Sequence, residues 1–101
     1  MKDLDLEILP TFKVSIHSKN REGFNGSVMK TVLKMDNALL NAIIERKFLP
    51  EIGDIIHFTS IDPGLELKII NVFPVISKDN KLGNLIIHGE SNLFKVNKDY
   101  E

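Results

Sequence analysis

Three histidines are the residues best suited to chemistry in this chain, and each follows an isoleucine: His17, His57 and His88. Each lies in a stretch expected to form a strand, so neighbouring strands could bring the imidazoles together. Neutral imidazole is a common zinc ligand, and Asp54 or Glu90 could complete or orient such a set. The three are far apart in sequence, however, and none forms a short-spaced pair. We therefore interpret them as solvent-facing strand residues, with a zinc site as the minor alternative.

Groups for acid–base or nucleophilic catalysis are present but scattered. Glu51, Asp54, Asp62 and several serines are available, yet no recognisable spacing joins them. The chain has no glycine-rich phosphate loop, no Gly-x-Ser-x-Gly and no His-Glu-x-x-His. It also has no cysteine, which excludes disulfides, thiolate metal sites and cysteine nucleophiles. The sequence therefore predicts a protein that is not an enzyme, with no catalytic residue and no cofactor.

Positive charge is concentrated between residues 11 and 35, where five basic residues accompany one acidic residue, Glu22. On one face of a hairpin these cations could bind phosphates, and an aromatic ring at the tip could stack on an unpaired base. The competing interpretation is that the cations only keep an exposed strand soluble. The candidate residues for nucleic-acid or anion binding are Lys13, Lys19, Arg21, Phe24, Lys30 and Lys34.

An apolar stretch, residues 73–76, ends a long expected strand and contains Pro74, which cannot donate to a hydrogen-bond ladder. Such an edge can accept a strand from a partner. The competing interpretation is that a neighbouring strand or the segment from Leu93 to Val96 covers it. We expect a binding or accessory protein that engages a protein partner or forms a homodimer, with nucleic-acid binding as the alternative. The candidate edge residues are Phe73, Val75 and Ile76.

Hydrophobic periodicity predicts which elements position these residues in the first half of the chain. Alternation of apolar and polar residues predicts one strand at residues 4–8 and a second, with a clearer pattern, at 11–19. Asn25-Gly26 suits a type I′ turn, which predicts a hairpin with a second strand at 27–35. In that register Leu33 and Met35 face the core and Val32 faces solvent. Asp36 is expected to cap a helix from residue 37 to about residue 48.

In the second half, residues 55–61 and 65–76 are expected to form a hairpin around a type II turn at Asp62-Pro63-Gly64. The apolar phase slips at Ile69-Ile70, which predicts a bulge in the second of these strands. A last strand is expected at 84–88, with an extension toward Val96 as the alternative.

The whole chain is expected to be one domain, residues 1–101, with residues 1–10 and 97–101 loosely ordered. Hydrophobic residues make up 43% and charged residues 27%, which is typical of globular proteins. The fold class is α+β, in the order ββαβββ, with one helix packed on a mainly antiparallel sheet, either β-grasp-like or a small half-open barrel (OB/SH3-like). No long apolar run suggests a membrane segment, so we expect a cytoplasmic protein. Lysine outnumbers arginine 11 to 2, which favours a bacterial or phage origin.

Overall fold

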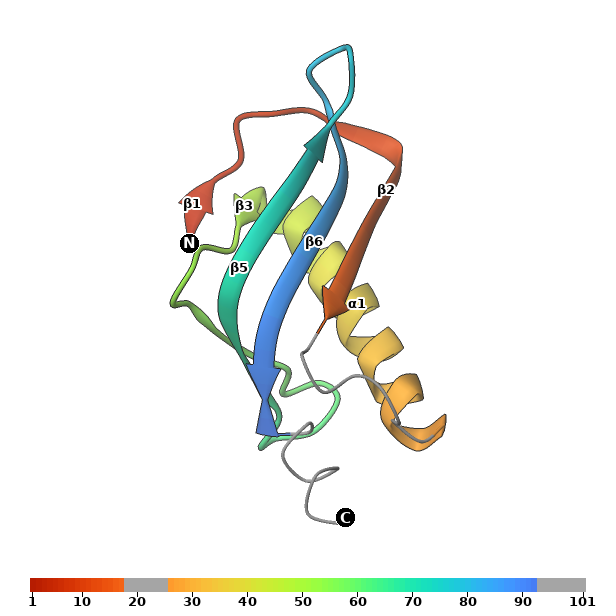
Figure 1. Cartoon of the computed structure of the whole chain (residues 1–101), viewed down its shortest axis with the longest axis vertical. Coiled ribbons are helices and arrows are strands. Elements are labelled where there is room, and N and C mark those ends of the chain that lie inside the picture. The colour runs from red at the N-terminus through yellow and green to blue at the C-terminus, as the bar shows by residue number, and fades with distance from the viewer. Residues whose placement is uncertain (18–25, 93–101) are drawn as a thin grey trace.

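The computed structural model describes residues 1–17 and 26–92 of the chain (Figure 1). In these residues the chain forms one helix and six strands: β1 (Lys2–Asp3), β2 (Ile8–His17), α1 (Gly26–Arg46), β3 (Phe48–Leu49), β4 (Ile55–His57), β5 (Glu66–Ile76) and β6 (Leu82–Ser91). The expected strand at residues 4–8 is not formed. Its place is taken by β1 and by the early start of β2, while Leu4 is buried in the core.

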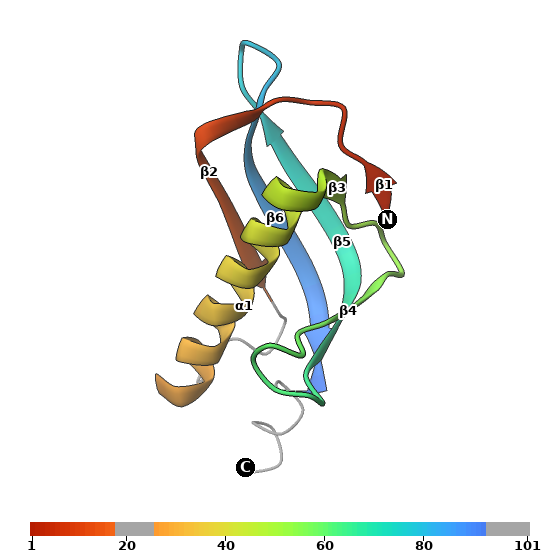
Figure 2. The same ribbon diagram turned by 180° about the vertical axis from the view of Figure 1, so that it is seen from behind.

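Four strands form one sheet in the order β2-β6-β5-β4, and β1 pairs with β3 in a separate two-stranded sheet. Strand β2 is parallel to β6, whereas β6–β5, β5–β4 and β1–β3 are antiparallel. Figure 1 looks onto the uncovered face of the larger sheet, and Figure 2 shows α1 lying across the opposite face. The prediction of an α+β fold with one helix on a mainly antiparallel sheet is confirmed. In the described residues the larger sheet is open, with edges at β2 and β4.

The predicted hairpin with a second strand at residues 27–35 is wrong, because α1 already begins at Gly26. Apolar residues recur along the helix at steps of three and four and form one buried stripe. In this arrangement Val32 is buried, while Leu33 is 59% exposed. Asp36 therefore lies inside the helix rather than at its start. The stripe consists of Val28, Val32, Met35, Leu39 and Ile43.

The second hairpin forms as expected between β4 and β5, but β4 ends at His57 rather than at residue 61. The type II turn is also wrong. The N–H of Leu65 donates to the carbonyl of Asp62 at 3.0 Å, as in a β-turn, yet Gly64 lacks the positive φ that a type II turn needs. The N–H of Gly64 instead donates to Asp62 Oδ1 at 2.9 Å, so the aspartate side chain holds this turn.

The bulge predicted at Ile69-Ile70 is confirmed. Strand β5 pairs Ile69 with Gly89 of β6 and then Asn71 with His88, which leaves Ile70 as the extra residue. The extra residue changes the alternation, so that Leu67 and Ile69 face the helix before the bulge and Asn71 faces away from it afterwards.

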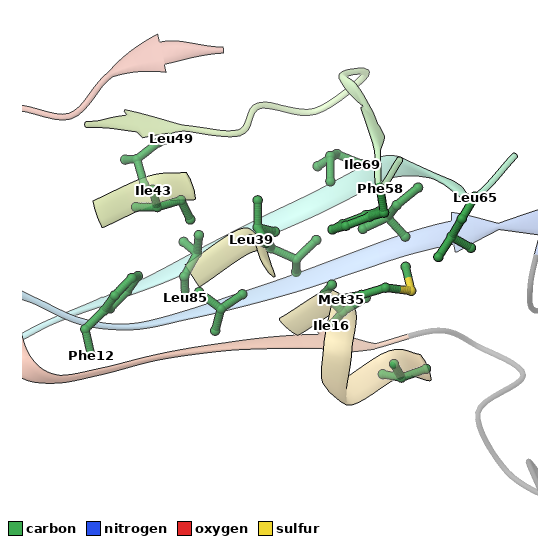
Figure 3. Packing of buried hydrophobic residues seen from close by; sticks show 14 of the residues in the cluster. Phe12, Ile16, Met35, Leu39, Ile43, Leu49, Phe58, Leu65, Ile69 and Leu85 are labelled. Carbon is green, nitrogen blue, oxygen red and sulfur yellow. The ribbon is translucent and has the colours of Figure 1, made fainter. Parts of the chain in front are cut away.

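The core lies between the larger sheet and a layer that packs on one of its faces (Figure 3). This layer is made of α1 and of residues 55–60, which comprise the edge strand β4 and the residues just after it and are called the segment around β4. Phe58, just after β4, packs over β5 near Leu39 of the helix. Burying one such side chain completely contributes roughly 1.5–3 kcal/mol. Among the described residues, this layer covers one face of the sheet only. The side chains with almost no exposure are Ile16, Val32, Met35, Leu39, Ile43, Leu67, Ile69, Leu82, Leu85 and Ile87.

Candidate interaction surface at the free edge of strand β5

Two of the three histidines lie together. His17 of β2 and His88 of β6 are register partners, and their ring centroids are 5.9 Å apart. The ring of Phe73 meets His88 edge-on, with centroids 5.1 Å apart. His57 lies instead on β4, where its Nδ1 is 3.8 Å from a carboxylate oxygen of Glu66. Within residues 1–17 and 26–92, no three histidine or acidic side chains are placed to hold a metal ion.

The basic candidates that the structure describes do not share one strand face, because α1 takes the place of the second strand of the predicted hairpin. Lys13 is exposed on β2, whereas Lys30 and Lys34 are exposed one turn apart on the helix. Three further candidates lie outside the described residues: Lys19, Arg21 and Phe24.

Two of the acidic residues considered for catalysis, Glu51 and Asp54, contact the Met1 amino group and so join the N-terminus to the loop before β4. Asp54 Oδ2 lies 2.8 Å from the Met1 amino nitrogen and accepts the N–H of Glu51 at 2.8 Å. The hydrogen bond from the Met1 amino group, followed by that from the Glu51 N–H, lowers the pKa of Asp54 from its ordinary value of 3.8. The same contact with Asp54 raises the pKa of the Met1 amino group above 8.0. Glu51 adds a second carboxylate oxygen 3.4 Å from this amino group.

One edge of the larger sheet is partly blocked by the helix. The N–H of Ile16, on the outer strand β2, donates to Asp36 Oδ1 at 2.9 Å. A side chain that occupies an edge N–H removes one of the bonds that an added strand would need. This role of Asp36 could not be recognised from the sequence, because its position before an expected helix was interpreted as a cap.

On the other side of the sheet, β5 extends well beyond the short edge strand β4. Its partner β4 pairs only with Glu66, Leu67 and Lys68, and the loop before β4 reaches no further than Ile69, whose N–H donates to the carbonyl of Asp54 at 2.8 Å. Strand β6, by contrast, accompanies β5 as far as Ile76. In the described part of the chain, residues 70–76 of β5 therefore have a strand neighbour on one side only.

The alternation of backbone groups shows which residues face outward along this edge. The N–H of Ser77 donates to the carbonyl of Lys81 at 2.8 Å, so Ser77 faces β6. The register shifts between Val75 and Ile76, where Gly83 is the extra residue on β6, so the alternation along β5 itself continues. Successive residues of β5 therefore face opposite sides, and Ile76, Pro74 and Val72 face away from β6. The missing N–H of Pro74 thus falls on the outer side, where it costs no ladder bond. The outward-facing residues are Val72, Pro74 and Ile76.

The side chains along this edge are apolar and accessible. Phe73 is 46% exposed, Val75 47% and Ile76 40%. Phe73 and Val75 lie opposite Ile86 and Asn84 of β6, on the sheet face that α1 does not cover. No charged residue occurs between Lys68 and Lys78. In the part of the chain that the structure describes, the three residues predicted as an edge lie where β5 has no second strand neighbour. The segment from Leu93 to Val96, considered as a cover for them, lies outside the described residues. Within the described residues, Asn84 Oδ1, on the strand opposite Val75, has no hydrogen-bond partner.

Among the described residues, α1 is not apolar enough over sufficient length to cross a membrane. Comparison with known proteins finds no family model, no curated protein and no solved structure that matches this chain.

Proposed function

We propose that this chain is a non-enzymatic binding protein that self-associates through the outer edge of β5. The observation that carries the proposal is the stretch of β5 after the bulge, which has one strand neighbour among the described residues and an uncharged, exposed outer edge. Unpaired edges of this kind are templates for the addition of another strand. A second copy of the chain supplies a strand with the same length and the same lack of charge.

We place the twofold axis of the contact at Pro74. Outward-facing residues of the two copies then stand opposite each other, with Val72 of one copy facing Ile76 of the other. Each of these pairs can exchange two N–H···O bonds. Only the Pro74 pair at the axis lacks donors, so both missing N–H groups fall in this one central pair and the flanking pairs keep their bonds. A twofold contact is self-complementary and closes as a dimer.

The same register matches the side chains. Phe73 of one copy stands directly opposite Val75 of the other on the uncovered face, at a pair without hydrogen bonds, where side chains approach most closely. Two such aromatic–aliphatic pairs flank the axis and shield each other from water. Each cross-strand pair contributes roughly 0.2–1 kcal/mol. The contact is confined to one strand from each copy, so we expect reversible association at high protein concentration rather than an obligate dimer.

Sedimentation velocity over a wide concentration range tests the proposal. The wild-type protein should shift from monomer toward dimer with rising concentration. Val75→Lys places a lysine opposite Phe73 in both halves of the contact and should keep the protein monomeric. Ile52→Lys is the matched control, because Ile52 is even more exposed, at 69%, but lies in the loop before β4.

A wild-type protein that stays monomeric into the millimolar range would contradict the proposal. Dimerisation that survives in Val75→Lys would do so as well. A monomer that binds oligonucleotides at low salt, and loses them steeply as salt rises, would favour the nucleic-acid alternative instead.

A further inference from the structure

An open groove of about 670 Å³ runs between α1 and the segment around β4, on the opposite side of the sheet from Phe73. Figure 2 looks onto this side of the molecule. The helix flank here carries Ala38 and Ala42, one turn apart, so two small side chains leave space that larger residues would fill. The volume falls in the range of sites that bind small ligands or short peptide segments. A second hollow of about 520 Å³ adjoins it along the same helix flank.

Within the described residues, strand β4 has backbone groups without a partner along this groove. At one end of its ladder the N–H of Ile69 donates to the carbonyl of Asp54, and at the other the N–H of Phe58 donates to the carbonyl of Leu65 at 2.9 Å. These bonds place even-numbered residues of β4 toward β5, so the N–H and C=O groups of Ile55 and His57 face away from the sheet. Both residues line the groove.

Positive charge lies at one end of the groove. Lys2 of β1 and Arg46, the last residue of α1, line it together with Asp3. Asp54 and Glu51 lie next to this end, where both contact the Met1 amino group. Neither cation has an ion pair with any residue that the structure describes. This end adjoins the first residue of β4, because Met1 contacts Asp54, just before Ile55. A carboxylate at this end would meet two unpaired cations.

We propose that this groove binds the free carboxyl terminus of an extended peptide. The peptide adds antiparallel to β4, bonding to the backbone of Ile55 and His57, as in other complexes formed by strand addition. An antiparallel strand ends where β4 begins, so its terminal carboxylate lies beside Lys2 and Arg46. An aliphatic side chain of the peptide fills the space over Ala42. The direction, the charge and the apolar floor all agree with this one occupant.

A matched pair of synthetic peptides tests the proposal: acetyl-Thr-Val-Thr-Val with a free carboxyl terminus, and the same peptide as the carboxamide. Titration into the 15N-labelled full chain should move the amide signals of Ile55, His57 and Ala42. The free acid should bind at least about tenfold more tightly than the amide, since hydrogen bonds to a charged carboxylate are stronger than those to a neutral amide. Arg46→Ala should remove this preference, whereas Lys30→Ala, an exposed cation elsewhere on the helix, should keep it.

Ala42→Leu fills the groove and should abolish binding of both peptides while leaving the helix intact, because leucine is also a strong helix former. Equal affinity for acid and amide would overturn the proposal, as would signal changes confined to other surfaces or no binding at millimolar peptide. Self-association through β5 uses a different surface, so its presence or absence is measured separately and does not affect the peptide result.

Discussion

Asp54 connects three parts of the chain at the scale of single residues. Its carboxylate meets the Met1 amino group and the Glu51 N–H, and its backbone carbonyl accepts the N–H of Ile69 of β5. It therefore fixes the loop that ends the covered part of the β5 edge. The lowered pKa of Asp54 means that its carboxylate stabilises the folded state above the unfolded pKa, and that this stability is lost as the pH falls through the folded pKa.

The Met1 amino group behaves in the opposite sense. Its raised pKa means that its contribution is complete below the unfolded value and is lost as the pH rises through the folded value. The contact thus stabilises the protein between the two ordinary values of 3.8 and 8.0.

Asp54→Asn should lower the free energy of unfolding at pH 7 by up to about 1 kcal/mol, the range for exposed ion pairs. The difference from wild type should shrink as the pH falls through the folded-state pKa of Asp54, which lies below 3.8, because the wild-type carboxylate then becomes protonated. Urea denaturation at pH 7 and in acid measures both values. Asp79→Asn, in the β5–β6 turn, is the control and should have little effect. A loss of the same size at both pH values would show that the charge of Asp54 contributes nothing.

At the scale of elements, local patterns predicted the features that depend on neighbouring residues. The phase slip at Ile69-Ile70 predicted the bulge because a strand that must keep apolar side chains on one side needs an extra residue there. Residues 73–76 were predicted as an edge because proline cannot serve a central strand. These predictions needed only the chemistry of adjacent residues.

Long-range features could not be predicted in this way. The segment around Val32 fits a strand as well as a helix over a short window, and Asn25-Gly26 favoured the turn. The helical stripe becomes clear only when Val28 and Val32 are joined to the residues after Asp36. The parallel pairing of β2 with β6 joins residues about 70 apart, as His17 and His88 show, and no local signal specifies it. The groove over Ala38 and Ala42 depends on that same tertiary packing.

Alanine substitutions at Val32 and Leu33 distinguish the observed helix from the hairpin that the sequence predicts for the same residues. In the helix Val32 is 1% exposed, so Val32→Ala should lower the free energy of unfolding by roughly 1–3 kcal/mol through the lost methyl groups and the cavity left behind. Leu33 lies on the exposed side of the helix, so Leu33→Ala should change the free energy of unfolding by no more than about 0.5 kcal/mol. Chemical denaturation measures both. The hairpin predicts the reverse order, and that order would exclude the helix.

At the scale of the whole molecule, the layers divide the surface between two kinds of contact. The helix and the segment around β4 cover one face of the sheet and leave a groove between them. In residues 1–17 and 26–92 nothing packs over the other face, which meets the outer edge of β5 at Phe73 and Val75. Pairing of two β5 edges would join two four-stranded sheets into one continuous sheet with both grooves on its opposite face. The dimer is the central claim, and its register is specific enough to be tested residue by residue.

Cysteine cross-linking tests this register most directly, because the chain has no cysteine of its own. With the twofold axis at Pro74, the Cα atoms of the two residues 74 should lie about 5.5 Å apart, within disulfide reach. The two residues 73 should lie about 7–8 Å apart, on a diagonal. Under mild oxidation Pro74→Cys should therefore form a disulfide-linked dimer much faster than Phe73→Cys. Equal rates, or no cross-link in Pro74→Cys at high protein concentration, would contradict the account.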